Sequence, residues 1–166
     1  MIRSMLYATD LGLYAPLVLQ HALSMARTFK ANLYVIHAVE PMGQFAQSVL
    51  ESYLDEPTLS ALHQQGLSTV MATIENRVFD TFRQELGDGN PDLSLISAVR
   101  VRQGDPGTVI LDQAQSLAVD LLILGSHSHR GDMDIPLGRT AARVLQMSPV
   151  PVYMVPLSQQ PGRRKT

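Results

Sequence analysis

Short aliphatic runs alternate with longer segments of helical periodicity along the whole of this 166-residue chain. Parallel strands need crossovers of that length, so the alternation is typical of βαβ units and predicts an α/β fold with a parallel sheet. We expect five strands, at residues 4–8, 33–39, 95–101, 121–124 and 150–155. Helical spacing of apolar residues predicts one helix between the first two strands, one over residues 58–86, one after Asp105 and one over residues 139–147.

The composition limits the cellular context and the class of partner. A formal net charge of -2 and a pI near 6.2 do not favour a polyanionic partner, so we expect no nucleic-acid binding. The absence of cysteine excludes disulfides and thiolate metal sites. No run approaches the ~18 apolar residues of a membrane span, and the N-terminus lacks the apolar core of a secretory signal. We therefore expect a soluble, cytoplasmic protein without membrane contact.

Proline, glycine and charge mark the connections. Residues 41–57 lack a clean period and include Pro41, Gly43 and Pro57, which predicts a loop, and potentially a lid, over the sheet. Prolines on both sides of residues 150–155 place the last strand at a sheet edge, because proline cannot donate to a ladder. We expect one domain over residues 1–157, followed by a disordered basic tail at residues 158–166.

The stretch GSHSHRGDMDIPLGRT, residues 125–140, connects an aliphatic strand to an amphipathic helix. Glycines in a tight loop and the free N–H groups at a helix start attract anions, so this stretch is the first candidate for a phosphate site. His127 and His129 suggest a metal only weakly, since zinc needs three or four ligands and the sequence offers no third. Asp105, in "GDPG", is most simply the N-cap of the next helix.

Four stretches together resemble the universal stress protein family over about residues 2–157. They are MLYATDLG, ANLYVIHAVEP, QGDPGTVILDQAQSLAVDLLILGSHS and LGRTAARVLQMSPVPVYMVP. The resemblance implies a doubly wound, Rossmann-like five-stranded parallel sheet of strand order 3-2-1-4-5, with helices on both faces. It also implies a homodimer formed through the last strand.

The resemblance further implies an adenine-nucleotide site, because the family's nucleotide-binding members share a glycine pattern that ends in Ser or Thr. Here the spacing holds through Gly125 and Gly138, but Ser128 stands at the second glycine. Arg139 takes the Ser/Thr place and Thr140 follows one residue later. Serine costs about 1 kcal/mol in the left-handed region that glycine reaches freely, so Ser128 counts against the motif unless only a small residue is needed.

By the same resemblance, Thr9, Asp10 and Val39 would hold the adenine or ribose, and His127 would lie beside the phosphates. Two of these residues have a structural alternative: Asp10 could satisfy the turn after the first strand, and Val39 could belong to the core. Arg139 could contact phosphate, fold over the pocket as a plug, or point into solvent.

Two hypotheses remain open at this stage. In one, the protein is a dimeric stress-response or regulatory factor that binds ATP or AMP, with Mg²⁺ accompanying ATP, and signals to an unknown protein partner. In the other, it is a nucleotide-free dimer that acts as an interaction module. No GxSxG, Walker A or paired-acid pattern is present, so we expect no enzyme beyond, at most, a slow ATPase.

Overall fold

The computed structural model describes residues 1–41, 43, 48–49, 52–53, 55–127 and 137–157. Five parallel strands form one sheet in the order β3-β2-β1-β4-β5. Their bounds are β1 Ser4–Ala8, β2 Asn32–Val39, β3 Ile96–Gln103, β4 Leu121–Gly125 and β5 Val152–Val155. The α/β class, the doubly wound sheet and its strand order are therefore confirmed, and the strand order reverses between β1 and β4.

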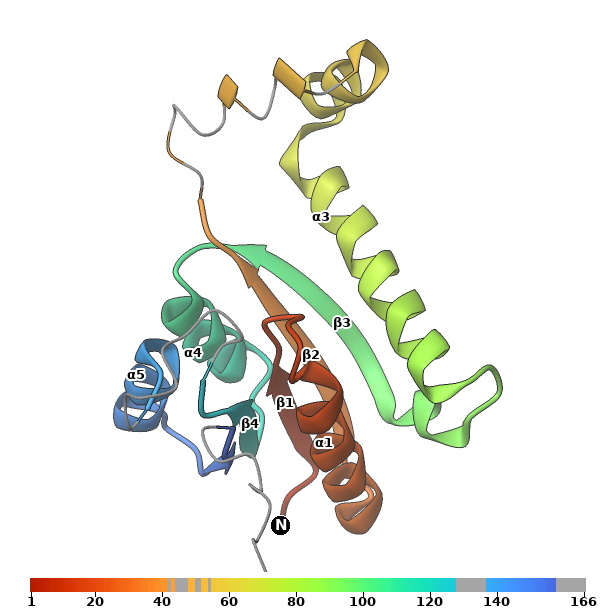
Figure 1. The fold of residues 1–166 in the computed structure, drawn as a ribbon. Coiled ribbons are helices and arrows are strands. Elements are labelled where there is room, and N and C mark those ends of the chain that lie inside the picture. Colours follow the sequence, from red (N-terminus) through yellow and green to blue (C-terminus); the bar gives the residue numbers. More distant parts are fainter. Residues whose placement is uncertain (42, 44–47, 50–51, 54, 128–136, 158–166) are drawn as a thin grey trace, which may run out of the picture.

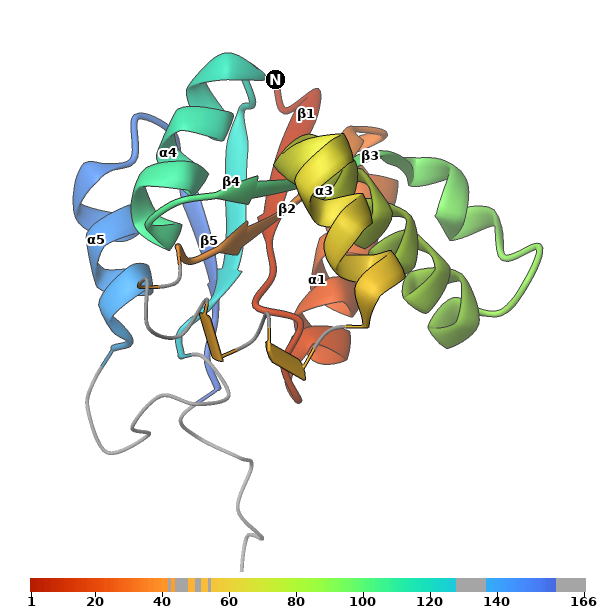
Figure 2. The same ribbon diagram turned by 90° about the horizontal axis from the view of Figure 1, so that it is seen from above.

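Two layers of helices cover the sheet (Figures 1 and 2). Helices α1 (Ala15–Phe29) and α3 (Glu56–Leu86) lie on one face, where Leu19 and Phe82 join a core with Met5 of β1. Helices α4 (Pro106–Ser116) and α5 (Arg139–Met147) lie on the other, where Ile110 and Val144 pack together. The aliphatic strand β4 is buried along residues 121–124, as expected of a strand covered on both faces.

Local chemistry explains where the elements begin and end. The Asp105 carboxylate caps α4 by accepting the Thr108 N–H at 3.1 Å, which confirms the expected N-cap. Helix α3 ends before Gly87 and Gly89, whose φ angles of 89° and 79° favour glycine.

Several of the sequence-based boundaries differ from those in the structure by one or more residues. Leu95 does not begin β3, because residues Pro91–Leu95 form a short 3-10 helix, η1, whose N-cap Asn90 accepts the Asp92 N–H at 2.9 Å. The last strand begins at Val152 rather than residue 150, since Ser148 folds its hydroxyl onto the backbone of Val150.

The expected loop over residues 41–57 is also shorter, because α3 already begins at Glu56. The remaining part of that segment lies partly outside the described residues, as does the whole tail at residues 158–166. The interpretations of these segments as a lid and a disordered tail stay predictions.

Candidate functional site

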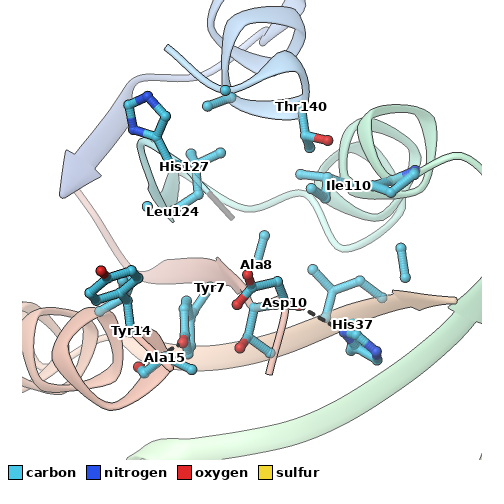
Figure 3. A pocket seen from close by; sticks show the side chains of 18 of the residues that line it. Tyr7, Ala8, Asp10, Tyr14, Ala15, His37, Ile110, Leu124, His127 and Thr140 are labelled. Atoms are coloured by element: carbon cyan, nitrogen blue, oxygen red, sulfur yellow. Dashed lines mark hydrogen bonds between the residues drawn. The ribbon is translucent and has the colours of Figure 1, made fainter. Parts of the chain in front are cut away.

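A cavity of about 740 Å³ opens at the carboxyl ends of β1, β2 and β4, where the strand order reverses (Figure 3). Open α/β sheets bind ligands at this position, and the volume falls within the range of roughly 300–1,000 Å³ of small-molecule sites. Apolar side chains, including Ile36, Ile110 and Leu124, form much of the wall. The structure thus offers a formed site at the place where the topology favours one.

Eight of the nine residues predicted from the sequence line this cavity: Thr9, Asp10, Val39, Gly125, His127, Gly138, Arg139 and Thr140. The ninth, Ser128, lies outside the described residues. Residues far apart in the chain therefore meet around one space, although no ligand role follows from position alone.

Hydrogen bonds fix the turn that follows β1. Thr9 Oγ1 accepts the Leu11 N–H at 3.0 Å, and Asp10 Oδ1 accepts the Gly12 N–H at 2.9 Å. Leu11 adopts a φ of 58°, a conformation that costs a non-glycine residue about 1 kcal/mol. One oxygen of Asp10 therefore satisfies the turn after β1, as the structural alternative expected. The Asp10 carboxylate also lines the cavity.

His37 of β2 supports the same turn, and sequence reasoning missed it. Its Nδ1 lies 2.9 Å from the carbonyl oxygen of Thr9, which can only accept, so Nδ1 carries the hydrogen. Tyr7 of β1 joins the cavity wall to α1 by donating its hydroxyl to the Ala15 carbonyl at 3.1 Å. Burial raises the pKa of the Tyr7 phenol far above its ordinary value, so Tyr7 remains a neutral donor there.

The two glycines of the expected phosphate motif have steric roles. Gly138 donates its N–H to the Ser126 carbonyl at 2.8 Å, and a Cβ on Gly138 would lie 2.9 Å from that same oxygen. A Cβ on Gly125 would lie 2.6 Å from Cδ1 of Leu157. Both glycines therefore allow segments to approach closely at the cavity wall.

The starts of the two helices on this side of the sheet differ in their capping. The Asp105 carboxylate caps α4, whereas Gly138, the N-cap of α5, has no side chain to accept from the first turn. The unpaired N–H groups and the helix dipole at such an end favour an anion. Gly138, Arg139, Thr140 and Ala141 place this end of α5 in the cavity wall.

Arginine charges stand beside these helix starts. Arg143 bonds Asp105 at 3.2 Å and the Thr108 hydroxyl at 3.1 Å. Hydrogen bonds from Thr108, and then the charges of Arg143 and Arg139, hold the pKa of Asp105 below its ordinary value. Arg139 is exposed and, within the described part of the chain, forms no ion pair or hydrogen bond through its guanidinium. It is thus the cation at the cavity that lacks a fixed acidic partner among those residues.

Among the described residues, no group of three or more His, Asp or Glu side chains is arranged to hold a metal ion. None of the helices in the described ranges is both long enough and apolar enough to cross a membrane.

Ser126 is another lining residue that the sequence analysis did not select. Its signal was weak, since it appeared only as a spacer between Gly125 and the next residue of the motif. It is 5% exposed and bonds two distant segments, the end of β5 with Leu157 and the start of α5, which only the structure reveals.

Comparison with known proteins gives a family and a fold. The model of the universal stress protein family matches residues 1–156. No curated protein matches the chain. Among solved structures, the universal stress protein UspA from Lactobacillus plantarum is similar at a TM-score of 0.64 and 20% identity, covering 93% of this chain and 97% of that one.

Two further structures share the fold at similar coverage. Hypothetical protein MJ0577, the subject of a structure-based assignment of biochemical function, has a TM-score of 0.68 and 21% identity, covering 96% of this chain and 99% of its own. A universal stress protein in complex with cAMP has a TM-score of 0.54 and 15% identity, covering 95% and 98%. At these identities the structures establish the common fold alone.

Proposed function

The chain belongs to the universal stress protein family, and on that premise we propose that it binds an adenine nucleotide, ATP or AMP, in the cavity at the carboxyl ends of β1, β2 and β4. The observation that supports this most is the start of α5. There a helix N-terminus without a side-chain cap and the guanidinium of Arg139, which forms no ion pair with the described residues, meet at the wall of a largely apolar cavity. The helix start and Arg139 suit an anionic phosphate tail, and the apolar wall suits a planar base.

The proposed pose has two ends. Adenine or ribose lies near Thr9, Asp10 and Val39, and the phosphates lie against Gly125, His127 and the first-turn amides of α5. Arg139 and Thr140 add side-chain donors at the phosphate end, and Ser128 is included by resemblance to the family motif. When ATP is the ligand, Mg²⁺ would accompany its phosphates.

The known structure of a universal stress protein with cAMP supports the choice of an adenine nucleotide as probe. We propose a regulatory role without catalysis beyond at most slow ATP hydrolysis. We also propose that residues 1–157 form one domain of a cytoplasmic homodimer, paired through β5, which signals to a protein partner. The second candidate is a nucleotide-free interaction module, favoured by the replacement of the family's glycine and Ser/Thr by Ser128 and Arg139.

Calorimetry with ATP, AMP and adenosine tests the proposal. We expect Arg139→Ala to weaken ATP by roughly 1.5–3 kcal/mol and adenosine much less, because the change removes a charge-assisted hydrogen bond to phosphate. Arg143→Ala is the matched control: it removes the same charge one helical turn away, where Asp105 already neutralises it. A stronger affinity for ATP in Arg139→Ala would identify Arg139 as a plug.

Gly138→Val tests the phosphate end independently of charge. Its side chain would collide with the Ser126 carbonyl and separate the two segments that form the wall, so we expect no ATP binding. Gly43→Ala is the control, since a Cβ there meets nothing within 4 Å. Absence of binding by all three ligands to the unmodified protein would reject the nucleotide and leave the interaction module.

A further inference from the structure

Ser126 joins the wall of the cavity to the end of the edge strand β5. Its N–H donates to the Val155 carbonyl at 2.9 Å, and its hydroxyl oxygen accepts the Leu157 N–H at 2.8 Å. Its own carbonyl accepts the Gly138 N–H at 2.8 Å. One buried residue thus holds the end of β4, the start of α5 and the segment after β5 together.

Leu157 brings the segment after β5 into the cavity itself. Its side chain lines the cavity and is 6% exposed. It occupies the space that a Cβ on Gly125 would need, close to Val18 of α1. A ligand that fills the cavity would therefore contact Leu157 and Ser126. It can do so only while the segment after β5 is docked against β4.

β5 is the strand whose docking is easiest to lose. It has four residues and lies at the edge of the sheet, and Val152, Tyr153 and Met154 are only half-buried. Edge segments with few buried contacts open locally at a small free-energy cost. When the end of β5 leaves β4, the hydrogen bonds from Ser126 and Leu157 are lost, and the cavity loses part of its wall.

We propose that Ser126 is a positioning residue that couples occupancy of the cavity to the docking of β5, so that ligand binding and pairing through this edge strengthen each other. The inference rests on the proposed nucleotide site and the proposed dimer. Both events need the same docked state of the segment from Val152 to Leu157. A shared two-state element of this kind gives a coupling that is equal in both directions.

The unmodified protein provides the first test. Amide hydrogen exchange, followed by NMR with and without ATP, reports the docking of β5 through the Leu157 N–H, which bonds Ser126 Oγ. Sedimentation over a range of protein concentrations gives the dimer dissociation constant in the same two conditions. We expect ATP to slow exchange at Leu157 and to tighten the dimer, each by at least about fivefold, the lower end of typical coupling factors.

The second test compares two serine variants. Ser126→Ala removes the acceptor of the Leu157 N–H and also the 2.8 Å bond between its hydroxyl and His127 Nδ1. With ATP at a concentration that calorimetry shows to saturate the variant, ATP should change the dimer dissociation constant by less than about twofold. Ser148→Ala is the matched control, because its hydroxyl bonds Val150, two residues before the opposite end of the same strand. We expect Ser148→Ala to keep the full ATP effect. Circular dichroism verifies that both variants are folded.

The outcomes separate this inference from the proposed function. If calorimetry shows ATP binding but neither exchange at Leu157 nor dimerisation responds, the coupling is wrong and the nucleotide site stands. If Ser126→Ala keeps the full ATP effect, the coupling does not run through Ser126. If ATP does not bind the unmodified protein, the proposed function fails and this inference fails with it.

Discussion

The two edges of the sheet are built in opposite ways. On β3, helix α3 lies alongside, and its Glu75 carboxylate accepts the outward-facing Val101 N–H at 2.9 Å and a bond from Arg102 at 3.0 Å. On β5, the carbonyls of Pro151 and Val155 accept from β4, so alternation turns the backbone groups of Val152 and Met154 outward. Within the described residues, no side chain bonds those outward groups.

This difference shows which edge is available for pairing. Unpaired strand edges are templates for other chains, and proteins protect them with charges, prolines or covering helices. Edge β3 has both a helix and a charge, whereas among the described residues β5 is protected only by being short and bracketed by Pro151 and Pro156. Exposed Leu145 and Met147 at the end of α5 add apolar surface just before β5. These features support our proposal that a second copy of the chain pairs at β5 rather than at β3.

The largest expected effect comes from charging the open edge. Val152→Lys together with Met154→Lys should raise the dimer dissociation constant by at least about a hundredfold, because an unpaired ammonium buried in an interface costs several kcal/mol. Sedimentation of the variant and of the unmodified protein measures the shift.

Ser97→Lys is the control at the other edge, since Ser97 is exposed on β3. It should leave the oligomeric state unchanged. A dimer that survives the double change at β5, or dissolves on the change at β3, would reverse the assignment of the two edges.

Much of this comparison was accessible from sequence, and the missing part has a physical reason. The prolines around residues 150–155 predicted an edge strand, and β5 is one. Nothing local identified the role of Glu75, because its partner Val101 is 26 residues away and contributes only a backbone N–H. Hydrophobic periodicity predicts that α3 packs on the sheet, but it does not reveal which polar residue reaches the free edge.

The candidate site was likewise predictable from the sequence only in part. The glycine spacing placed Gly125 and Gly138 at one site, but it did not reveal that a Cβ there would collide with Leu157 or Ser126. His37 was missed because it acts on the Thr9 carbonyl from a neighbouring strand. Contacts between a side chain and a distant backbone group leave no periodic signal, so they become visible only once the fold is known.

The second prediction concerns the protected edge. Glu75→Ala should lower the free energy of unfolding by about 1–3 kcal/mol, because the buried Val101 N–H loses its acceptor. Glu75→Gln keeps a carbonyl acceptor and should cost clearly less. Urea denaturation measures both variants. We expect neither to form higher oligomers, since α3 still covers β3; association of Glu75→Ala would show that the carboxylate alone protects this edge.

A smaller effect is expected at the hydroxyl of Tyr153, which anchors the open edge to α1. It lies 2.9 Å from Nδ1 of His21. Tyr153→Phe should lower the free energy of unfolding by about 0.5–1.5 kcal/mol, the net contribution of one hydrogen bond. Tyr34→Phe on β2 is the control and should be nearly neutral in the same denaturation experiment. Equal losses in both variants would show that the His21 bond adds nothing to β5.

The smallest effect tests whether a carboxylate charge stabilises the pairing of α4 with α5, the helix that precedes β5. Asp105 joins α4 to Arg143 of α5, and its pKa is lowered in the folded state by Thr108 and by the nearby arginines. A lowered folded pKa contributes stability that is complete above the ordinary carboxyl range and is lost as the pH falls through the folded value. Melting temperatures should therefore decline below about pH 4 more steeply in the unmodified protein than in Asp105→Asn. Asparagine caps helices as well as aspartate does, so the difference isolates the charge. Parallel curves for the two proteins would mean that the pairing of α4 with α5 does not depend on the carboxylate.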